Sequence, residues 1–525
     1  MSTDSTMNKQ ETHLEDSTRY VYTYTLTQKG KREDSNRYLY KKKTLPKFGS
    51  ANATVYKYIT GKFYHPSTRF EDLHGLSINK SGDCDLIQVN TKFIAVPISG
   101  PGGRIAIINA DKPGRLPVSL PCVMCGSEVT NFKFDPFNES ILVTVSNDNK
   151  IRVWEIPEGG IEQDVAEPKF ILEARGMDKI HLLEFHPTSK DVLLTTSDDL
   201  GSPTIRIWNL SSNQAQLTFP SLCKGTIFSC AWNPDGTQIV ITTKEKKIHL
   251  LDARTGQLIS EGPSHNSIRP SRLLWLNPET NLLISVGFGL GSTREVLLID
   301  KSDLSKPIAK CMIDVSPSVM SAYVDRDCQI VYIAGRGDRT IHTFHVDTDK
   351  KNLVAVAKIE SSSLQQGFAF LPKRVCDVKS IEIDKFYRLT PTNIEVVGVR
   401  VPRARVSKRY AMPEYFQDDI FVPTPDVEHS AQGADSWFKG ENKQLELISL
   451  QPKDMTELSI APPPASQLQS KKKFEMGKKF VSDEQRKQEQ MERMFKAAKD
   501  IPEPEAKSKA INPEDEEVAE DEWDD

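Results

Sequence analysis

The 525-residue chain lacks several features that would assign it directly to a class of protein. No run approaches the roughly 18 apolar residues that span a bilayer, and the polar N-terminus lacks the apolar core of a signal peptide. The eight cysteines are scattered, and only Cys122 and Cys125 form a CxxC, with no second pair or histidine pair at zinc spacing. We expect reduced cysteines in a cytoplasmic protein, with a metal or redox role for this pair as the alternative.

Catalytic motifs are also missing. The sequence contains no GxSxG, HExxH or Walker motif. The glycine-rich stretch 287–291 lies between two expected strands with no helix to face a phosphate, which favours a hairpin turn over a phosphate loop. His186 precedes Pro187 in a turn and is expected to be structural. The sequence therefore predicts a protein that is not an enzyme and needs no cofactor or metal.

A repeat fills the middle of the chain. Its first element is an apolar pair followed by a proline-containing turn, and its second is a polar turn followed by an apolar strand. The four turn prolines are 44 to 51 residues apart. The first element occurs at 132–140, 183–191, 230–238 and 273–281, and the second at 146–156, 197–210, 243–253, 292–300 and 335–346.

Each repeat holds about four short β-branched runs separated by turn residues, which is typical of a propeller blade. Five repeats are clear, and residues 86–110 and 367–400 add two outer ones. The fold class is therefore all-β, a seven-bladed WD40-type β-propeller. We expect a strand near 60–80 to complete the last blade, because an open ring leaves unpaired edges. One recurring strand position is predicted to pack between blades, and it is occupied by Trp154, Trp208, Leu251, Ile299 and Phe344.

Motifs after and within the repeats resemble the coronin family. EYFQDDIF (414–421), WFKG (437–440) and LISL (447–450) follow the repeats, and FDPF (134–137) and VWEIPEGG (153–160) lie within them. Over about residues 60–455 the chain is similar to the long coronins with two propellers, although it has room for only one. The resemblance implies an extension packed on the lower face of the propeller. It also implies binding to actin filaments and to the Arp2/3 complex, and, for the long class, a role in Golgi traffic.

One departure from the family concerns filament binding. The sequence GKFYH at 61–65 is similar to the coronin stretch Ser-Lys-Phe-Arg-His, so Tyr64 replaces an arginine that contributes to filament binding. Tyrosine cannot supply the guanidinium's permanent fork of donors. The candidate actin-binding residues are Lys62, Tyr64 and Arg69. No sustained heptads predict a coiled coil, so we expect a monomer.

The first 58 residues predict a mostly disordered arm that is basic and rich in tyrosine. It includes KKK at 41–43 and the alternating run RYVYTYTLT at 19–27, which is compatible with a strand. Such an arm suits an acidic protein or a lipid surface, and its few positive charges disfavour nucleic acid.

A short amphipathic helix is predicted within residues 481–500. Ser482 and Gln485 form a capping box at its start. Met491, Met494 and Phe495 then give one apolar stripe on a basic helix. A helix of this length is marginal alone in water, so the stripe is expected to pack on a partner, either the propeller or another protein.

The chain ends in an acidic tail, residues 501–525, with eleven acids and two lysines. Its end is similar to the acidic region of Arp2/3 activators, although no actin-monomer motif precedes it, which favours competition with activators. Carboxylates would steer the tail to a basic surface, and the indole would anchor it. The alternative is a solubilising tail with an incidental tryptophan. The candidate Arp2/3-binding residues are Glu520, Asp521, Glu522, Trp523, Asp524 and Asp525.

These predictions combine into a cytoplasmic scaffold at the actin cytoskeleton, which binds filaments through the propeller and Arp2/3 through the tail. The alternative is an adaptor in Golgi or endosomal membrane traffic with weak or no filament binding, peripheral at Golgi membranes. The predicted parts are an arm (1–58), a propeller (59–400), an extension (401–455), a linker (456–480), a helix (481–500) and the acidic tail (501–525).

Overall fold

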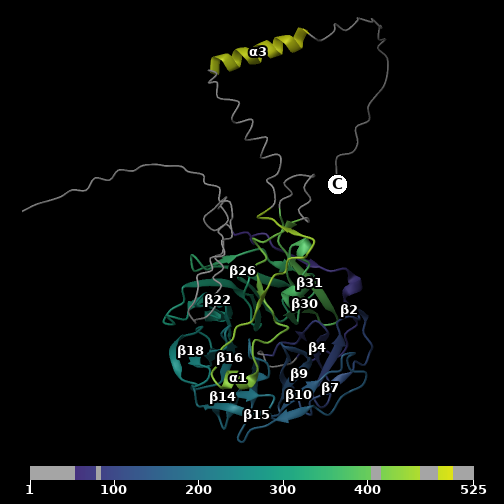
Figure 1. Ribbon diagram of the computed structural model, residues 1–525, viewed down its shortest axis with the longest axis vertical. Helices are drawn as coiled ribbons and strands as arrows, with labels where there is room; N and C mark the ends of the chain where they lie inside the picture. The colour runs from purple at the N-terminus through teal and green to yellow at the C-terminus, as the bar shows by residue number, and fades with distance from the viewer. Residues whose placement is uncertain (1–53, 79–83, 404–414, 461–482, 500–525) are drawn as a thin grey trace, which may run out of the picture. The chain divides into compact units, whose positions relative to one another are not determined.

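Seven β-sheets form a closed ring in the computed structural model, which describes residues 54–78, 84–403, 415–460 and 483–499 (Figure 1). The chain comprises two units, residues 1–461 and 462–525, which are described separately. The innermost strands of the sheets contact one another in the cyclic order β3, β8, β12, β16, β20, β24, β29 and again β3. The predicted seven-bladed propeller is therefore confirmed.

Six of the blades are antiparallel sheets, because polar turns separate short β-branched runs, and all but the first consist of consecutive strands; the first omits β6, which joins the closing blade. Each blade is named here by its third strand. The β5 blade contains β3 (Gln88–Val89), β4 (Phe93–Ile98), β5 (Arg104–Asn109) and β7 (Cys122–Met124), and the β10 blade contains β8 (Val129–Asp135), β9 (Asn138–Ser146), β10 (Ile151–Glu155) and β11 (Phe170–Leu172). The β14 blade contains β12 (Ile180–Phe185), β13 (Val192–Asp199), β14 (Ser202–Asn209) and β15 (Gln214–Pro220), and the β18 blade contains β16 (Ile227–Trp232), β17 (Gln238–Thr243), β18 (Lys247–Asp252) and β19 (Leu258–Pro263). The β22 blade contains β20 (Arg272–Trp275), β21 (Leu282–Phe288), β22 (Thr293–Asp300) and β23 (Ala309–Val315), and the β26 blade contains β24 (Met320–Asp325), β25 (Ile330–Gly335), β26 (Thr340–Asp347) and β27 (Asn352–Ala355), with β28 (Ile359–Glu360) beside β26.

The seventh blade closes the ring with strands from both ends of the propeller sequence. β1 runs antiparallel to β31, with Thr60 opposite Arg400 and Phe63 opposite Val397. The prediction that a segment near 60–80 closes the ring is confirmed. The closing blade contains β29 (Gly367–Phe370), β30 (Glu382–Leu389), β31 (Ile394–Arg400), β1 (Thr60–Phe63), β2 (Phe70–Glu71) and β6 (Gly114–Arg115).

The core lies between neighbouring blades. The predicted inter-blade position is buried in every blade where it was identified: Trp154, Trp208, Leu251, Ile299 and Phe344. Each of these side chains packs with buried residues of the preceding blade. This prediction is also confirmed, and it follows from the alternation of side chains along each strand.

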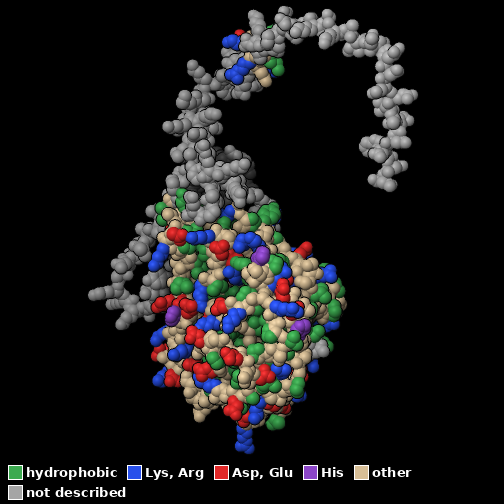
Figure 2. All heavy atoms as spheres, turned by 90° about the vertical axis from the view of Figure 1, so that its right-hand side faces the viewer, with side chains coloured by type: hydrophobic (Ala, Val, Ile, Leu, Met, Phe, Trp, Pro, Cys, Tyr) green, Lys and Arg blue, Asp and Glu red, His purple; other side chains and the backbone are tan. Residues whose placement is uncertain are grey.

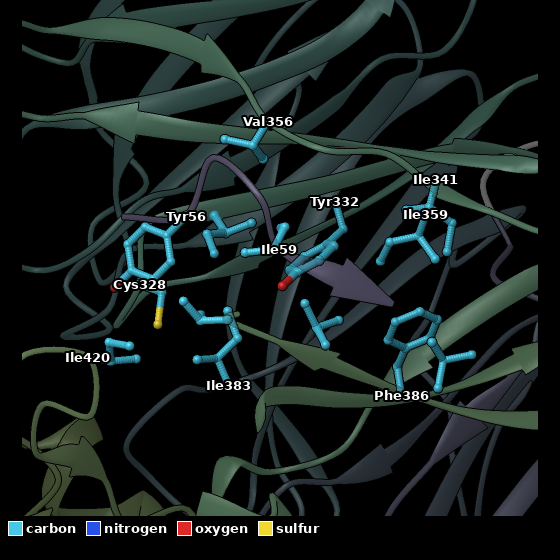
Figure 3. Close-up of a cluster of buried hydrophobic side chains, with 14 of the residues drawn as sticks. Tyr56, Ile59, Cys328, Tyr332, Ile341, Val356, Ile359, Ile383, Phe386 and Ile420 are labelled. Carbon is cyan, nitrogen blue, oxygen red and sulfur yellow. The ribbon is translucent and has the colours of Figure 1, made fainter. Parts of the chain in front are cut away.

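The core beside the closing blade gathers distant segments, as Figure 3 shows. Tyr56 and Ile59 from before β1 pack there with Tyr332 of β25, Phe386 of β30 and Ile420 of the extension. The Tyr56 ring lies 5.2 Å from the His345 ring. Tyr56 was assigned to the N-terminal arm, so the packed body includes residues before the expected boundary at 59.

The extension follows β31 and crosses the ring to the β14 and β18 blades (Figure 1). It contacts the loops that join the first strand of a blade to the second and the third strand to the fourth. These loops form the lower face of the ring. The opposite end of each blade, with the loops between second and third strands and between successive blades, is the upper face. The extension contains β32 (Tyr415–Phe416), β33 (Thr424–Pro425), α1 (Ala434–Phe438), β34 (Leu447–Ile448) and β35 (Thr456–Glu457).

The described part of the first unit also contains four short 3-10 turns: η1 (Pro66–Thr68), η2 (Leu290–Ser292), η3 (Lys373–Val375) and η4 (Val378–Ser380). The second unit contains α3 (Asp483–Lys499), a helix of 17 residues where the amphipathic helix was predicted. Among the described helices, none is both long and apolar enough to cross a bilayer.

Candidate functional site

The candidate filament surface lies on the outer strands of the closing blade. Tyr64 follows β1, and its hydroxyl donates to Glu382 Oε2 at 2.7 Å. Lys385 Nζ lies 4.9 Å from the centre of the Tyr64 ring. Partial burial, and then the bond to Glu382, raise the pKa of Tyr64. Tyr64 thus satisfies a fully buried carboxylate of its own blade, and its hydroxyl is turned toward the body.

The other two candidate residues present positive charge. Lys62 is exposed in the middle of β1. Arg69 is half-buried just before β2, and its Nε lies 3.9 Å from Glu395 Oε1. Figure 2 shows the side of the ring that carries β2 and β7, where acidic and basic side chains are interspersed. The structure therefore places the three predicted residues on one short segment at the outer edge of the closing blade.

Trp437 of α1 anchors the extension, a role that the sequence did not reveal. Its ring is fully buried and meets His186 and Trp232 edge to face, at centroid distances of 5.0 and 5.7 Å. Its Nε1 donates to Gly236 O at 3.2 Å. Edge-to-face contacts and a satisfied indole make this a well-packed contact of the extension with the propeller.

His186 completes that anchor as a neutral imidazole. Nδ1 accepts from the backbone N–H groups of Thr188 and Ser189, at 3.2 and 3.0 Å, so the proton belongs on Nε2, which lies 3.2 Å from Gly236 O. Burial lowers the pKa of His186 from 6.5 to about 3. The prediction that His186 is structural is confirmed.

Arg254, in the loop after β18, holds the end of α1. Its guanidinium lies 4.7 Å from the Trp437 ring centre and donates to Trp437 O at 3.0 Å and Glu441 O at 2.7 Å. Asn209 Nδ2 adds a bond to Asp435 Oδ1 at 3.0 Å. In the sequence, only the WFKG motif at 437–440 indicated this contact of Arg254 and Asn209 with α1.

The predicted partner helix presents its apolar stripe. Met491, Met494 and Phe495 on α3 are 60%, 71% and 72% exposed. The capping residue Ser482 lies outside the described residues, as do Glu520 to Asp525 with Trp523 and the N-terminal runs 19–27 and 41–43. The tail and arm hypotheses therefore remain predictions.

Two polar groups resemble reactive sites. His265 lies 3.0 Å from both Glu295 Oε1 and Ser285 Oγ, yet all three side chains are almost fully buried, so the group serves to join β21, β22 and the loop before β20. The predicted turn lies between β21 and β22; residues 287 and 288 end β21, and residues 289–292 make the turn.

The second polar group is Asp426, Glu428 and His429, whose ligand atoms lie within 4.8 Å of one another. His429 Nδ1 lies 2.8 Å from Asp426 Oδ2, and Glu428 pairs with Arg374. The hydrogen bond to His429 and the ion pair with Arg374 account for the group. Sequence inspection missed it because three polar residues in a loop carry no metal-binding spacing.

Comparison with known proteins gives family matches at two places. Residues 50–115 match the family described as a domain of unknown function (DUF1899), and residues 394–445 match a type of WD40 repeat. The first covers the closing strands and much of the β5 blade, and the second runs from β31 to α1 and beyond.

Individual relatives cover far more of the chain. Coronin-7 of Rattus norvegicus is 34% identical over 90% of this chain and 50% of that protein, so the chain spans about half the length of this relative. Coronin-2A of Bos taurus is 30% identical over 75% of each chain. The WD40 domain of Toxoplasma gondii coronin superimposes with a TM-score of 0.67 at 25% identity, covering 75% of this chain and 98% of that domain. By sequence and by fold, the chain belongs to the coronin family.

Proposed function

We propose that the chain is a regulator of the actin cytoskeleton, a binding scaffold that attaches to actin filaments through the closing blade. The observation that supports the proposal is a pair of cations at the outer edge of that blade: Lys62 is exposed on β1, and Arg69 is half-buried just before β2. Lys62 pairs with Gly398 in the ladder that closes the ring, and the backbone carbonyl of Arg69 accepts from Gly114 N at 2.8 Å, so both cations stand on fixed backbone and can meet an acidic partner surface. Because Tyr64 is committed to Glu382, these two cations carry the filament contact.

The second part of the proposal is that the acidic tail binds the Arp2/3 complex, with Trp523 as its anchor. Its support is the charge of the tail and the exposed stripe of α3, which offers a second apolar contact to the same partner. The protein would then act in the cytoplasm where filaments branch. Filament and Arp2/3 contacts would lie in different parts of one chain, as a scaffold requires.

Co-sedimentation with actin filaments tests the first part. We expect the full chain to pellet at low salt, and Lys62→Glu with Arg69→Glu to weaken binding at least about tenfold, because both contacts become repulsive. Lys306→Glu, an exposed lysine between β22 and β23, is the matched control and should bind as the parent does. A full chain that stays in the supernatant while it localises to Golgi membranes would support the membrane-traffic adaptor instead.

The same full chain, used to capture Arp2/3, tests the tail. Trp523→Ala should reduce capture about tenfold or more, as expected for a buried aromatic anchor, while Val518→Ala should not. Undiminished capture by Trp523→Ala would reduce the tail to a solubilising segment and leave the filament test unaffected.

A further inference from the structure

Three exposed apolar side chains gather at the upper end of the β22 blade, which lies between the β18 and β26 blades in Figure 1. Ile268 precedes β20, Leu290 lies in η2, and Val315 ends β23; they are 68%, 74% and 67% exposed. Scattered single apolar residues need no explanation, but a group on one edge suggests a contact.

The contacts of these loops show that the three residues belong to one surface. Val315 pairs with Thr293, whose Oγ1 donates to Leu290 O at 2.7 Å. On the other side, the Arg269 guanidinium lies 4.9 Å from the ring centre of Phe288, the last residue of β21. The loop with Ile268 is thereby held against the strand that leads to Leu290.

Positive charge surrounds this apolar group. The cations come from adjacent loops that hydrogen bonds join in sequence around the upper face. Lys244 N donates to Thr226 O at 3.0 Å, Lys246 Nζ donates to Asn266 Oδ1 at 2.9 Å, and Arg336 N donates to Val319 O at 3.3 Å. The cations are Lys224, Lys244, Lys246, Arg269 and Arg339, and together with Ile268, Leu290 and Val315 they are termed the basic sector.

Negative charge in the basic sector is scarce. Its loops contain two acids, Glu245 and Asp338, and Asp338 already accepts from Arg294 Nη1 at 2.7 Å and from Gly335 N at 2.8 Å. The upper loops of the β10 and β14 blades are less basic, because there four acids face three cations and Asp198 and Asp199 add two acids at the end of β13. The loop acids are Glu128, Asp148, Glu173 and Asp178, and the loop cations are Lys150, Arg175 and Lys179. Asp148 pairs with Arg152, and Asp199 pairs with Arg206.

We propose that the basic sector binds an acidic segment of a partner protein that carries one bulky apolar side chain. The segment's carboxylates would lie over Lys224, Lys244 and Lys246, and its apolar side chain would cover Ile268 and Leu290. Because the basic sector is positively charged, it favours an acidic partner segment. The more acidic half of the upper face repels such a segment, so the segment approaches the basic sector. The extension covers part of the lower face, and this site on the upper face is separate from the closing-blade surface proposed for filaments.

Fluorescence anisotropy tests the site with a labelled peptide, Glu-Asp-Glu-Asp-Trp-Asp-Glu-Asp, and the full-length chain. We expect Ile268→Ser with Leu290→Ser to weaken binding about tenfold, because the apolar contact is lost. Lys224→Glu with Lys244→Glu should weaken it at least as much and reduce its sensitivity to salt. All four residues are on the surface, so the thermal unfolding midpoint should not change.

Matched controls exist on the acidic half of the same face. Leu200 is 93% exposed between β13 and β14, and Lys179 is exposed before β12. Leu200→Ser and Lys179→Glu should leave peptide affinity within about twofold of the parent, since rim substitutions outside an interface are near neutral.

Four results would overturn the proposal. Equal losses of peptide affinity in the control variants would show that the basic sector is not the binding site. Equal affinity for a peptide with alanine in place of tryptophan would show that Ile268 and Leu290 make no apolar contact with it. Binding to phosphatidylserine vesicles but not to the peptide would make the surface a membrane contact. A tenfold gain in affinity on removal of residues 501–525 would identify the chain's own acidic end as the occupant.

Discussion

His186 carries a pH-dependent part of the stability of this molecule. Both ring nitrogens are used, since Nδ1 accepts two backbone N–H groups and Nε2 lies against Gly236 O. Protonation of Nδ1 would break both accepted bonds and place a charge among Trp232 and Trp437. The folded state therefore keeps the imidazole neutral far below its ordinary pKa.

The sign of the effect follows from linkage. The unfolded chain binds the proton near pH 6.5 and the folded chain only near about 3, so stability is lost as pH falls between these values. At pH 5 the loss attributable to His186 should be about 2 kcal/mol relative to neutral pH. Chemical denaturation at pH 5.0 and 7.5 measures it.

The matched variant His186→Gln isolates this contribution. Burial raises the pKa of Asp135 to about 6, so its contribution has the opposite sign: stability is gained as pH falls through about 6. Asp135 is present in parent and variant, and the difference between their pH dependences removes it. Identical pH dependences in the two proteins would contradict the account of His186.

At the scale of elements, α1 illustrates how a short segment is held by its partners. A helix of five residues has no stability of its own in water. It persists because Trp437 fills a site between the β14 and β18 blades and Arg254 holds its end. The extension should therefore detach locally when that one side chain is removed.

We expect Trp437→Ala to lower the local stability of the extension by about 3–5 kcal/mol, the cost of truncating a buried tryptophan. Hydrogen exchange at residues 430–445 should accelerate, while exchange in β8 to β11 should not change. Leu447→Ala, at a half-exposed position of the same extension, is the control and should leave exchange slow. Slow exchange in Trp437→Ala would mean that other contacts hold the extension.

The strands of the blades and the helix α1 of the extension differ in how well the sequence predicts them. The blades could be predicted because period-two strands and proline turns recur, and tertiary packing then repeats with them. The position of α1 could not, because Trp437 and Gly236 are distant in sequence and no periodicity relates them. The same holds for Tyr64. The sequence indicates that Tyr64 occupies the position of a family arginine, but it does not indicate the hydrogen bond of Tyr64 to Glu382, which is 318 residues away.

At the scale of the whole molecule, closure of the ring depends on a close approach at Gly61. This residue pairs with Val399, and a Cβ there would lie 2.4 Å from Ile359 Cγ2 of β28. The absent side chain lets β1 lie against the neighbouring blade. Gly61→Ala should therefore strain the closing ladder and lower the free energy of unfolding by about 1–3 kcal/mol.

Urea denaturation of Gly61→Ala against Gly159→Ala measures this effect. A Cβ at Gly159 would meet no atom within 4 Å, so that variant controls for the generic effect of alanine on the unfolded chain. Equal urea midpoints for the two variants would show that Ile359 moves aside at no cost in stability. The close approach at Gly61 would then not limit closure of the ring.

The pairing of β1 with β31 also has a consequence during synthesis. Phe63 leaves the ribosome about 330 residues before its partner Val397, which at about 5–20 residues per second is a delay of tens of seconds. Throughout that interval β1 is an unpaired strand in a crowded solution, open to pairing with another nascent chain. Among the described strands of the ring, the strand that completes it is thus the first to be made and the last to be protected, and chaperone demand during translation should be concentrated in this interval.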